Sequence, residues 1–451
     1  MAMNTGGFDS MQRQLEAELR SLSSESKRRN STIRHASDKS IEILKRVHSF
    51  EELERHPDFA LPFVLACQSR NAKMTTLAMQ CLQGLSTVPS IPRSRLSEIL
   101  DAFIEATHLA MEIQLKVLQV VPIFFKTYGK FIYGPLCKKL LLCCSNLLHV
   151  PNKAPVVVGT ASATLQQLID EIFDRLSIES VVDDKQYEVL ISNSESIKVN
   201  VYRYDANKLF DNICSLNEIS SNGAVSDEEM LLDIGDIPID YGLEILESIL
   251  KNSQKNLLEC QDLQYLLRVK AIPLLLRCIS SSRHFSTAVR SCRCLKLLIR
   301  KEYLSILELE LEVILSLLIH GISVESNLSG WQRVLSLELF KDLSQDPEIV
   351  NTLYMDYDNY PDKKHVFKYL LKECIVLLNS PEYITFLAPS KVVEKMDSPL
   401  ITTENSTVKT KFMHLLDKSN APSINITYII SLILTICNHL CEGLNKSALE
   451  S

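Results

Sequence analysis

The stretch GWQRVLSLELFKDLSQDPEIVNTLYMDYDNYPDKK, residues 330–364, decides the fold because it joins an apolar helix to a polar turn and a second helix. It also holds the only tryptophan of the chain. Apolar residues at the spacing i, i+3, i+4 and i+8 predict a helix at its start. They are Trp331, Val334, Leu335 and Leu339. Because Leu337, Phe340 and Leu343 widen this stripe, we expect the helix to be covered on two sides.

A polar turn follows the helix, in residues 354–361 (YMDYDNYP). Three tyrosines are interleaved with three short polar side chains, and a proline closes the run. Such a turn is rich in hydrogen-bonding groups, and Asp362 stands where it can cap the next helix, expected over residues 363–379. A helix, a rigid polar turn and a second helix together predict a structural hub.

The hub resembles a motif of a known domain. Residues 331–335 (Trp-Gln-Arg-Val-Leu), followed by Asp-Tyr-Asp-Asn at 356–359, are similar to the box of the homology-upstream-of-Sec-seven (HUS) domain. That domain belongs to the large Golgi Arf guanine-nucleotide exchange factors and their relatives. The family box reads Asn-Tyr/Phe-Asp-Cys-Asp/Asn. This chain keeps Tyr357 and Asp358 but departs at the other three places, which suits a divergent relative without an exchange domain. The departures are Asp356 for Asn, Asn359 for Cys, and Tyr360 at the last place.

The N-terminal half resembles the dimerisation and cyclophilin-binding (DCB) domain of the same family, through residues 11–23 (MQRQLEAELRSLS) and 39–45 (KSIEILK). The resemblance implies a non-catalytic scaffold or regulator of vesicular traffic between the trans-Golgi network, endosomes and vacuole. It implies a cytoplasmic protein attached peripherally to trans-Golgi network and early endosome membranes. The implied partners are a Dopey-type protein, an Arf-like small GTPase, indirectly a phospholipid flippase, and a second copy of the chain.

Two alternative functions stay open at this point. The first is a regulator of nucleotide exchange on an Arf-like GTPase. The second is a module that binds anionic phospholipids.

The composition favours an all-α protein with an apolar core. Of the 451 residues, 46% are hydrophobic and 23% are charged, which is ordinary for a soluble protein. Glycine and proline are scarce, at 12 and 16 residues, so few glycine-requiring turns of β-rich folds are available. Helical patterns with short connectors run through residues 57–177 and resume near residue 239. We therefore predict an all-α, irregular armadillo/HEAT-like helical solenoid in two blocks.

An acidic segment, residues 181–235, separates the two blocks. It contains 11 acidic and 4 basic residues, so it accounts for the whole formal net charge of −7. Alternation of Ile197, Val199 and Val201 with polar residues gives a weak strand signal. The acidic, polar composition is typical of a linker or mobile insertion. We predict a DCB domain over residues 9–180, an acidic linker or insertion over 181–235, and a HUS domain over 236–451.

Thirteen cysteines lack paired spacing, so we predict neither a disulfide framework nor a zinc site, and we expect a reducing cytosol. The longest apolar run, residues 424–437, has 14 residues, fewer than the roughly 20 of a membrane span, and should be a buried helix. The N-terminus shows no signal-peptide pattern.

No catalytic motif is present: there is no phosphate-binding loop, dinucleotide fingerprint, nucleophile elbow or His-Glu-x-x-His motif. We predict no enzyme activity, no cofactor and no metal. Lone histidines inside apolar helices, such as His320 and His439, are expected to be core residues. Nucleic acid is not an expected partner, since the chain is acidic and its basic stretch has few aromatic residues.

Residues 268–301 contain nine Lys/Arg and no Asp or Glu. The predicted basic face consists of Arg290, Arg293, Lys296, Arg300 and Lys301. Such a face could dock anionic phospholipids or an acidic partner. We favour the alternative, in which these cations pair within the chain. The expected acidic partners are Glu302, Glu308, Glu310, Glu312 and the acidic segment.

The hub residues are the second candidate site, for partner binding or interdomain contact. They are Trp331, Asp356, Tyr357, Asp358 and Asn359. We favour a brace that fastens two helices, because short polar side chains and tyrosine serve such turns. The alternative is a surface for the DCB block or another chain.

Overall fold

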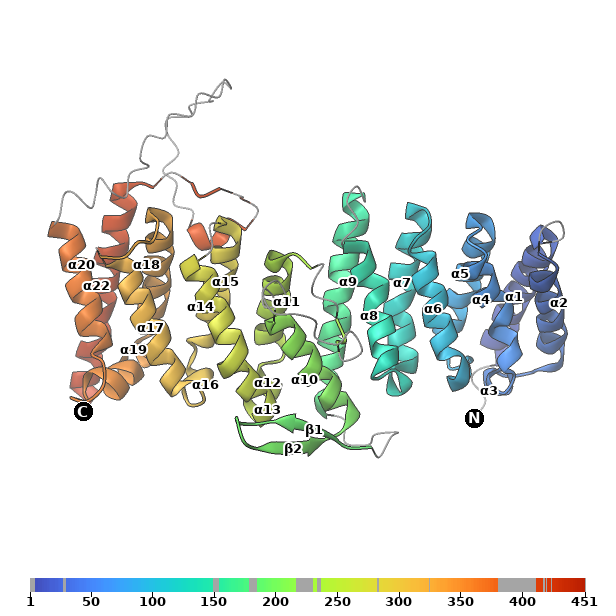
Figure 1. Ribbon diagram of the computed structural model, residues 1–451, viewed down its shortest axis with the longest axis horizontal. Coiled ribbons are helices and arrows are strands. Elements are labelled where there is room, and N and C mark those ends of the chain that lie inside the picture. Colours follow the sequence, from blue (N-terminus) through green and yellow to red (C-terminus); the bar gives the residue numbers. More distant parts are fainter. Residues whose placement is uncertain are drawn as a thin grey trace, which may run out of the picture. The chain divides into compact units, whose positions relative to one another are not determined.

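The structure is a computed structural model that describes residues 5–26, 30–148, 154–177, 185–215, 230–232, 237–281, 284–323, 325–379, 411–416, 418, 420–422 and 424–450. Within these residues the chain is helical, apart from one two-stranded sheet (Figure 1). It divides into two compact units, Met1–Ile237 (unit 1) and Pro238–Ser451 (unit 2). The predicted all-α class is confirmed.

Unit 1 is built from antiparallel helix pairs joined by short turns. Its helices are α1 (Thr5–Ser26), α2 (Ser31–Arg46), α3 (Phe50–Glu54), η1 (Pro57–Ala60), α4 (Leu61–Gln68), α5 (Ala72–Ser86), η2 (Arg93–Arg95), α6 (Leu96–Ala106), α7 (Met111–Tyr128), η3 (Gly129–Phe131), α8 (Pro135–Leu148), α9 (Pro155–Asp174), η4 (Arg175–Ser177) and α10 (Val201–Cys214).

The longer helices of unit 1 form two layers. In one layer α2, α4, α6 and α8 contact each other in order, and in the other α1, α5, α7 and α9 do the same. The apolar stripes face inward between the layers, as where Phe103 of α6 meets Phe124 of α7 edge-on at a centroid distance of 5.4 Å. Each helix therefore packs only on its neighbours along the array, which is the arrangement of a helical solenoid.

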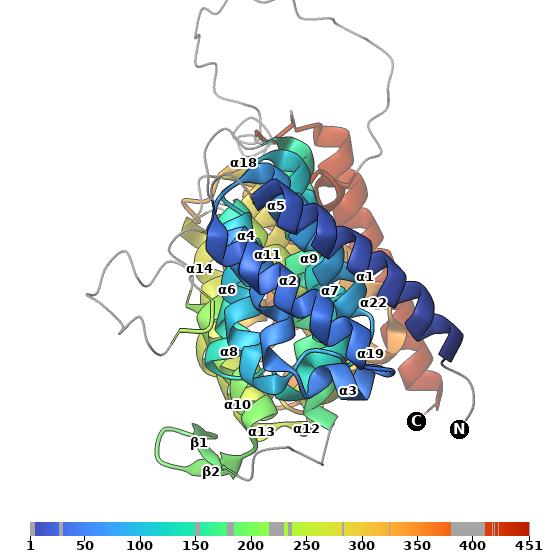
Figure 2. The same cartoon turned by 90° about the vertical axis from the view of Figure 1, so that its right-hand side faces the viewer.

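The segment expected to be a linker or insertion is partly folded. Strands β1 (Tyr187–Leu190) and β2 (Ser196–Val199) form an antiparallel hairpin, with Tyr187 opposite Val199, and this hairpin projects beyond the helices (Figure 2). Helix α10 then packs on α9 and η4. Leu209 and Phe210 of α10 are buried in unit 1. The acidic composition of the whole segment had hidden this amphipathic helix. The strand signal was correct for Ile197 and Val199, whereas Val201 begins α10.

Unit 2 repeats the helix-pair construction. Its helices are α11 (Ile239–Asn252), α12 (Gln254–Glu259), α13 (Gln261–Leu266), the π-helical turn η5 (Leu267–Ala271), α14 (Ile272–Ser281), α15 (Phe285–Leu298), α16 (Lys301–Leu304), α17 (Glu308–Ile322), α18 (Gly330–Ser344), α19 (Pro347–Leu353), the π-helical turn η6 (Tyr354–Asp358), α20 (Val366–Asn379), η7 (Phe412–His414) and α22 (Ile426–Glu450).

Two layers also make up unit 2. Helices α14, α17 and α20 follow one another in one layer, and α11, α15, α18 and α22 in the other. Hairpin pairs α14–α15 and α17–α18 join the layers. Units 1 and 2 thus each have the predicted armadillo/HEAT-like construction.

Helix α22 contains residues 426–437 of the apolar run 424–437 that we expected to be buried. Residues Ile426–Asn445 are long and apolar enough to cross a membrane, the one such helix in the part of the chain that the structure describes. One face of α22 packs on α18 and α19. This face buries Ile429, Leu432, Ile433, Ile436 and Leu440. The helix is therefore a packed element of unit 2 with an exposed outer side.

All thirteen cysteines are free thiols. Most are buried, and burial raises the pKa of the Cys67 and Cys292 thiols to about 12. Cys441 alone is exposed. Among the described residues, no three His, Cys, Asp or Glu side chains gather as metal ligands would.

Candidate functional site

Helix α18 is the centre of unit 2. It begins with a capping box, in which Ser329 and Gln332 satisfy each other's backbone N–H groups. Every residue from 332 to 340 is buried, because α15, α17, α19 and α22 all contact this helix. Trp331 is half-buried and meets Phe285 of α15 edge-on at 5.5 Å. The predicted hub helix therefore exists and is covered on more than two sides.

Two carboxylates on α18 hold three other segments in place. The fully buried Glu338 accepts hydrogen bonds from the backbone N–H groups of Phe412 (2.7 Å) and Met413 (3.0 Å), and from the hydroxyl of Tyr428. One turn later, Asp342 pairs with Lys296 of α15 and with Lys411. These two carboxylates therefore fasten α15, η7 and α22 to one helix.

The ion pairs of Asp342 also set its protonation. Burial of Asp342 favours the neutral form, but the hydrogen bonds from Lys296 and Lys411 outweigh it and hold the pKa of this carboxyl below its usual value. Sequence analysis did not select Glu338 or Asp342. They could have been found in the sequence as two carboxylates at i and i+4 inside an otherwise apolar helix. Charged groups buried in such a helix need hydrogen-bonding or ionic partners.

The box of residues 356–359 divides into inward and outward side chains. Tyr357 is buried, and its hydroxyl donates to the carbonyl of Glu308 at the start of α17. The carboxylate of Asp358 accepts from the backbone N–H groups of Phe367 and Lys368, both at 3.1 Å. Asp358 thus caps α20, so the expectation that Asp362 caps this helix was wrong.

The other two box residues face outward, with Asp356 half-buried and Asn359 exposed. Trp331 packs on α15 at the start of α18, whereas the box lies beyond α19, against α17 and α20. The hub residues therefore form two separate contacts. Tyr357 and Asp358 have the geometry of a brace, because their hydrogen bonds join η6 to α17 and α20.

The predicted basic face is largely paired within the chain. Arg293 Nη2 lies 2.5 Å from Glu247 Oε1, and Arg290 Nη1 lies 3.3 Å from Glu244 Oε2. Lys301 pairs with Glu348 at 2.6 Å, and Lys296 pairs with Asp342 as described above.

The pairing partners differ from those expected. They come from α11, α18 and α19, whereas Glu308, one of the expected acids, pairs with Lys363. The difference arises because α15 packs against α11 and α18, an arrangement that the linear sequence does not give. Arg300 is exposed at the C-terminal end of this face.

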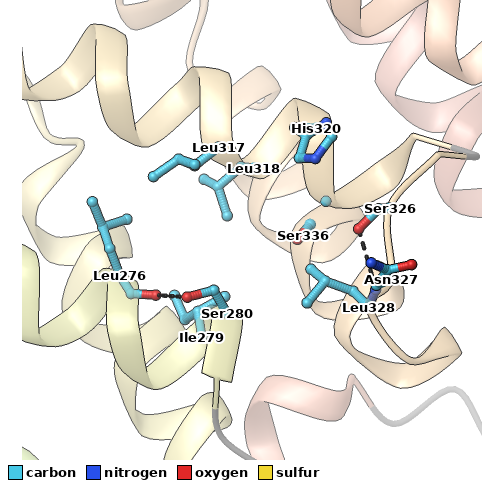
Figure 3. A pocket seen from close by; sticks show the side chains of 11 residues that line it. Leu276, Ile279, Ser280, Leu317, Leu318, His320, Ser326, Asn327, Leu328 and Ser336 are labelled. Carbon is cyan, nitrogen blue, oxygen red and sulfur yellow. Dashed lines mark hydrogen bonds between the residues drawn. The ribbon is translucent and has the colours of Figure 1, made fainter.

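A cavity of about 290 Å³ opens between α14, α17 and the segment before α18 (Figure 3). Its walls are mainly apolar and come from Leu276, Ile279, Leu317, Leu318 and Leu328. The Ser280 hydroxyl donates to the Leu276 carbonyl on one wall, and the Leu328 N–H donates to Ser326 on the opposite one. The cavity is built from α14 and from α17 with the segment that follows it, so no single sequence motif predicts it.

His320 lies at the mouth of this cavity and also lines a second one, of about 270 Å³, between α17 and α20. His320 is exposed, so its expected place in the core was wrong. His439 is half-buried, with Nδ1 3.2 Å from the Ser344 hydroxyl. The outer face of α17 is thus flanked by a cavity on each side.

Comparisons with known proteins match two successive domains, and the second begins within unit 1. A family model described as "Mon2/Sec7/BIG1-like, dimerisation and cyclophilin-binding domain" (DCB) matches residues 7–180. A second, described as "Mon2/Sec7/BIG1-like, HUS domain", matches residues 202–366, which include the box and α10 except for its first residue. The HUS match thus begins within the segment that we had expected to be a linker.

Relatives called "Protein MON2 homolog" are similar along most of the chain. The Schizosaccharomyces pombe protein is 22% identical, over 95% of this chain and 27% of that protein. The Homo sapiens protein is 23% identical, over 78% of this chain and 22% of that protein. The Drosophila melanogaster protein is 25% identical, over 76% of this chain and 21% of that protein. The chain spans about a quarter of the length of these relatives.

Among solved structures, a crystal structure of Kap121p aligns with this chain at 12% identity and a TM-score of 0.26. The alignment covers 79% of this chain and 39% of the Kap121p chain. This similarity is too low to support an argument, and the fold assignment rests on the helix contacts above. The two domain matches together cover most of the chain, in the order DCB then HUS. The chain therefore belongs to the Mon2/Sec7/BIG1-like family.

Proposed function

We propose that the chain is a non-catalytic scaffold that regulates vesicular traffic between the trans-Golgi network, endosomes and vacuole. The observation that carries this proposal is the DCB and HUS pair on a solenoid of stacked helices. Arrays of this kind present long exposed helix faces, which suit protein docking. The description of the first domain names dimerisation and cyclophilin binding, which supports protein partners and a homodimer.

The proposed partners are a Dopey-type protein, an Arf-like small GTPase and, through the Dopey-type protein, a phospholipid flippase. The proposed location is the cytoplasmic side of trans-Golgi network and early endosome membranes, held there peripherally. Family membership supports both proposals. The relatives are about four times longer than this chain. The partners and location of the full-length family members are therefore proposed, and not shown, for these 451 residues.

The test is affinity capture from cytosol with the full chain as bait. We expect enrichment of a Dopey-type protein and an Arf-like GTPase, with no change in the rate of nucleotide release when the purified chain is added to that GTPase. Capture of neither protein would contradict the scaffold function. Faster nucleotide release would favour the exchange-regulator alternative.

The lipid-binding alternative has its own test, flotation with phosphatidylserine vesicles. The exposed Arg300 is the residue of the basic face to reverse, because Arg290, Arg293, Lys296 and Lys301 are engaged in ion pairs. Flotation that falls with salt and with Arg300→Glu would support this alternative. The internal pairing of the other four cations favours the scaffold.

A further inference from the structure

The outer face of α17 carries a row of exposed apolar side chains. Leu309, Val313 and Leu317 stand at i, i+4 and i+8 and are 74%, 52% and 46% exposed. Single exposed apolar residues are common on protein surfaces, but a contiguous row marks an interaction site. At a rise of about 1.5 Å per residue, this row is about 12 Å long. It ends at the cavity of Figure 3, because Leu317 lines that cavity.

Acidic side chains surround the other end of the row. Glu310 and Glu312 lie on α17, and Asp356 lies in η6, whose Tyr357 donates a hydrogen bond to the first residue of α17. Burial raises the pKa of the Tyr357 phenol, and the negative charges of Glu308, Asp356, Glu312 and Glu310 raise it further, while Lys363 Nζ lies 5.4 Å from the centre of the ring. Among the described residues Lys363 pairs with Glu308, and its charge also interacts with that of Asp356, whereas Glu310 and Glu312 form no ion pair.

Helix stability explains only part of this acidic cluster. Glu308 and Glu310 lie in the first turn of α17, where carboxylates favour the helix dipole. Glu312 lies beyond that turn, and Asp356 belongs to another element. Glu310 and Glu312, which form no ion pair among the described residues, together with the exposed apolar row therefore define a surface that is complementary to cationic and apolar groups.

We propose that the outer face of α17 binds a basic amphipathic helix of a partner protein. Apolar side chains of that helix, spaced i, i+4 and i+8, lie along Leu309, Val313 and Leu317. Its last anchor enters the cavity beside Leu317, and its Lys or Arg residues meet Glu310, Glu312 and Asp356. A helix fits because the row follows one helix ridge, and ridges pack into the grooves of a second helix.

Other occupants fit this surface less well. A small molecule would be enclosed by its site, whereas most of the row lies outside the cavity. An anionic membrane would meet the negative charges of Glu310 and Glu312 beside the row, which disfavour its binding. A second copy of the chain could offer α20, where Lys368 and Lys372 are exposed, so the test below includes the oligomeric state.

The test uses the full chain and fluorescence anisotropy of a labelled synthetic peptide of about 14 residues, some four helical turns. The peptide carries leucine at i, i+4 and i+8 and lysine flanking one end. A matched peptide has glutamate in place of each lysine. We expect saturable binding of the lysine peptide, at least tenfold tighter than that of the glutamate peptide.

Val313→Glu combined with Leu317→Glu should weaken binding of the lysine peptide at least tenfold. Leu434→Glu is the matched control, since Leu434 is 53% exposed on α22. Glu310→Lys combined with Glu312→Lys should reverse the preference, so that the glutamate peptide binds more tightly. Misfolding cannot produce such a reversal.

Several results would overturn the proposal. They are no binding of the lysine peptide, equal binding of both peptides, or binding that the α17 variants leave unchanged. A dimer or a vesicle interaction lost in the Val313→Glu, Leu317→Glu variant would assign the face to a second copy or to lipid instead. The inference rests on the proposed scaffold function, but different experiments test the two. Affinity capture of partners can succeed when the peptide does not bind, which would overturn the inference and leave the scaffold function standing.

Discussion

Asp205 is a buried carboxyl group with little to hold its charge. It lies on α10 and is 3% exposed. Oδ2 accepts one hydrogen bond, from the backbone N–H of Gly134 at 2.8 Å, and Oδ1 has no partner among the described residues. Burial raises the pKa of Asp205 to about 7, against an ordinary value of 3.8. The charged form is therefore disfavoured in the folded protein.

The raised pKa gives a pH dependence with a defined sign. Between pH 4 and 7 the folded protein holds a proton that the unfolded chain has lost, so stability falls as pH rises through this window. Asp205→Asn removes the charge, and we expect it to stabilise unit 1 by a few kcal/mol at pH 8, with about 4 kcal/mol as the upper bound.

Thermal unfolding followed by circular dichroism at pH 5 and pH 8 checks this prediction. The melting temperature of the variant should exceed that of the natural protein more at pH 8 than at pH 5. An equal difference at both values would show that Asp205 does not titrate in this range.

Asp358 tests whether the box is a brace or an interface. Its replacement by alanine removes the cap of α20 and leaves the N–H groups of Phe367 and Lys368 without their acceptor. We expect Asp358→Ala to cost about 1–2 kcal/mol. Denaturant unfolding monitored by Trp331, the only tryptophan, reports on unit 2.

The exposed neighbour Asn359 supplies the control, and Asn359→Ala should change stability by less than about 0.5 kcal/mol. If Asp358→Ala kept full stability but lost partner capture, the box would be an interface. A loss of stability alone supports the brace.

At the scale of elements, α18 holds unit 2 together through Asp342. Asp342→Asn leaves Lys296 and Lys411 without their carboxylate, and we expect a loss of about 1–2 kcal/mol at pH 7. Because the pKa of Asp342 is held below its ordinary value, its contribution is present above pH 4 and is lost as the carboxyl protonates at lower pH. The difference between the two proteins should therefore shrink in acid.

The pair Lys301–Glu348 is the control, since its side chains are 67% and 70% exposed. Glu348→Gln should cost less than about 1 kcal/mol, as exposed ion pairs do. Equal losses in the two variants would mean that Asp342 acts as an ordinary surface charge.

Apolar periodicity predicted the elements well, because a stripe at helical spacing must be buried against something. It located α18 and predicted that this helix is covered. It did not reveal α10, where acidic residues elsewhere in the segment concealed a short amphipathic helix. The cap of α20 was also missed, because the π-helical turn η6 places Asp358 beside N–H groups nine and ten residues later.

The candidate sites were less predictable than the helices, because ion pairs and cavities depend on which helices become neighbours. The cations of α15 are paired with α11 and α18, whereas the expected acids were Glu302 to Glu312, which follow α15, and the acidic segment 181–235. The cavity beside Leu317 is assembled from α14 and from α17 with the segment that follows it. The sequence showed that charges would pair, but not with which residues.

At the scale of the whole molecule, contacts between neighbouring helices dominate each unit. A substitution that destabilises one helix should therefore destabilise mainly the helices packed against it. Leu100→Ala removes a fully buried side chain from α6 and should cost about 2–5 kcal/mol. Hydrogen exchange should rise most in α6 and in α4 and α8, which contact it, and least in α1 and α2.

Val156→Ala, at a 63% exposed position of α9, is the matched control and should leave exchange nearly unchanged. A uniform rise through all of unit 1 after Leu100→Ala would show that the unit opens as a single cooperative block.

The burial of the thiols has a practical consequence. Twelve of the thirteen cysteines are wholly or partly shielded, whereas Cys441 is exposed on α22 near the C-terminal end of unit 2. Since alkylation needs an accessible thiolate, a maleimide dye or spin label added briefly at neutral pH should attach mainly at that position. The natural chain thereby offers its own handle for single-molecule tracking or surface immobilisation, without any engineered residue.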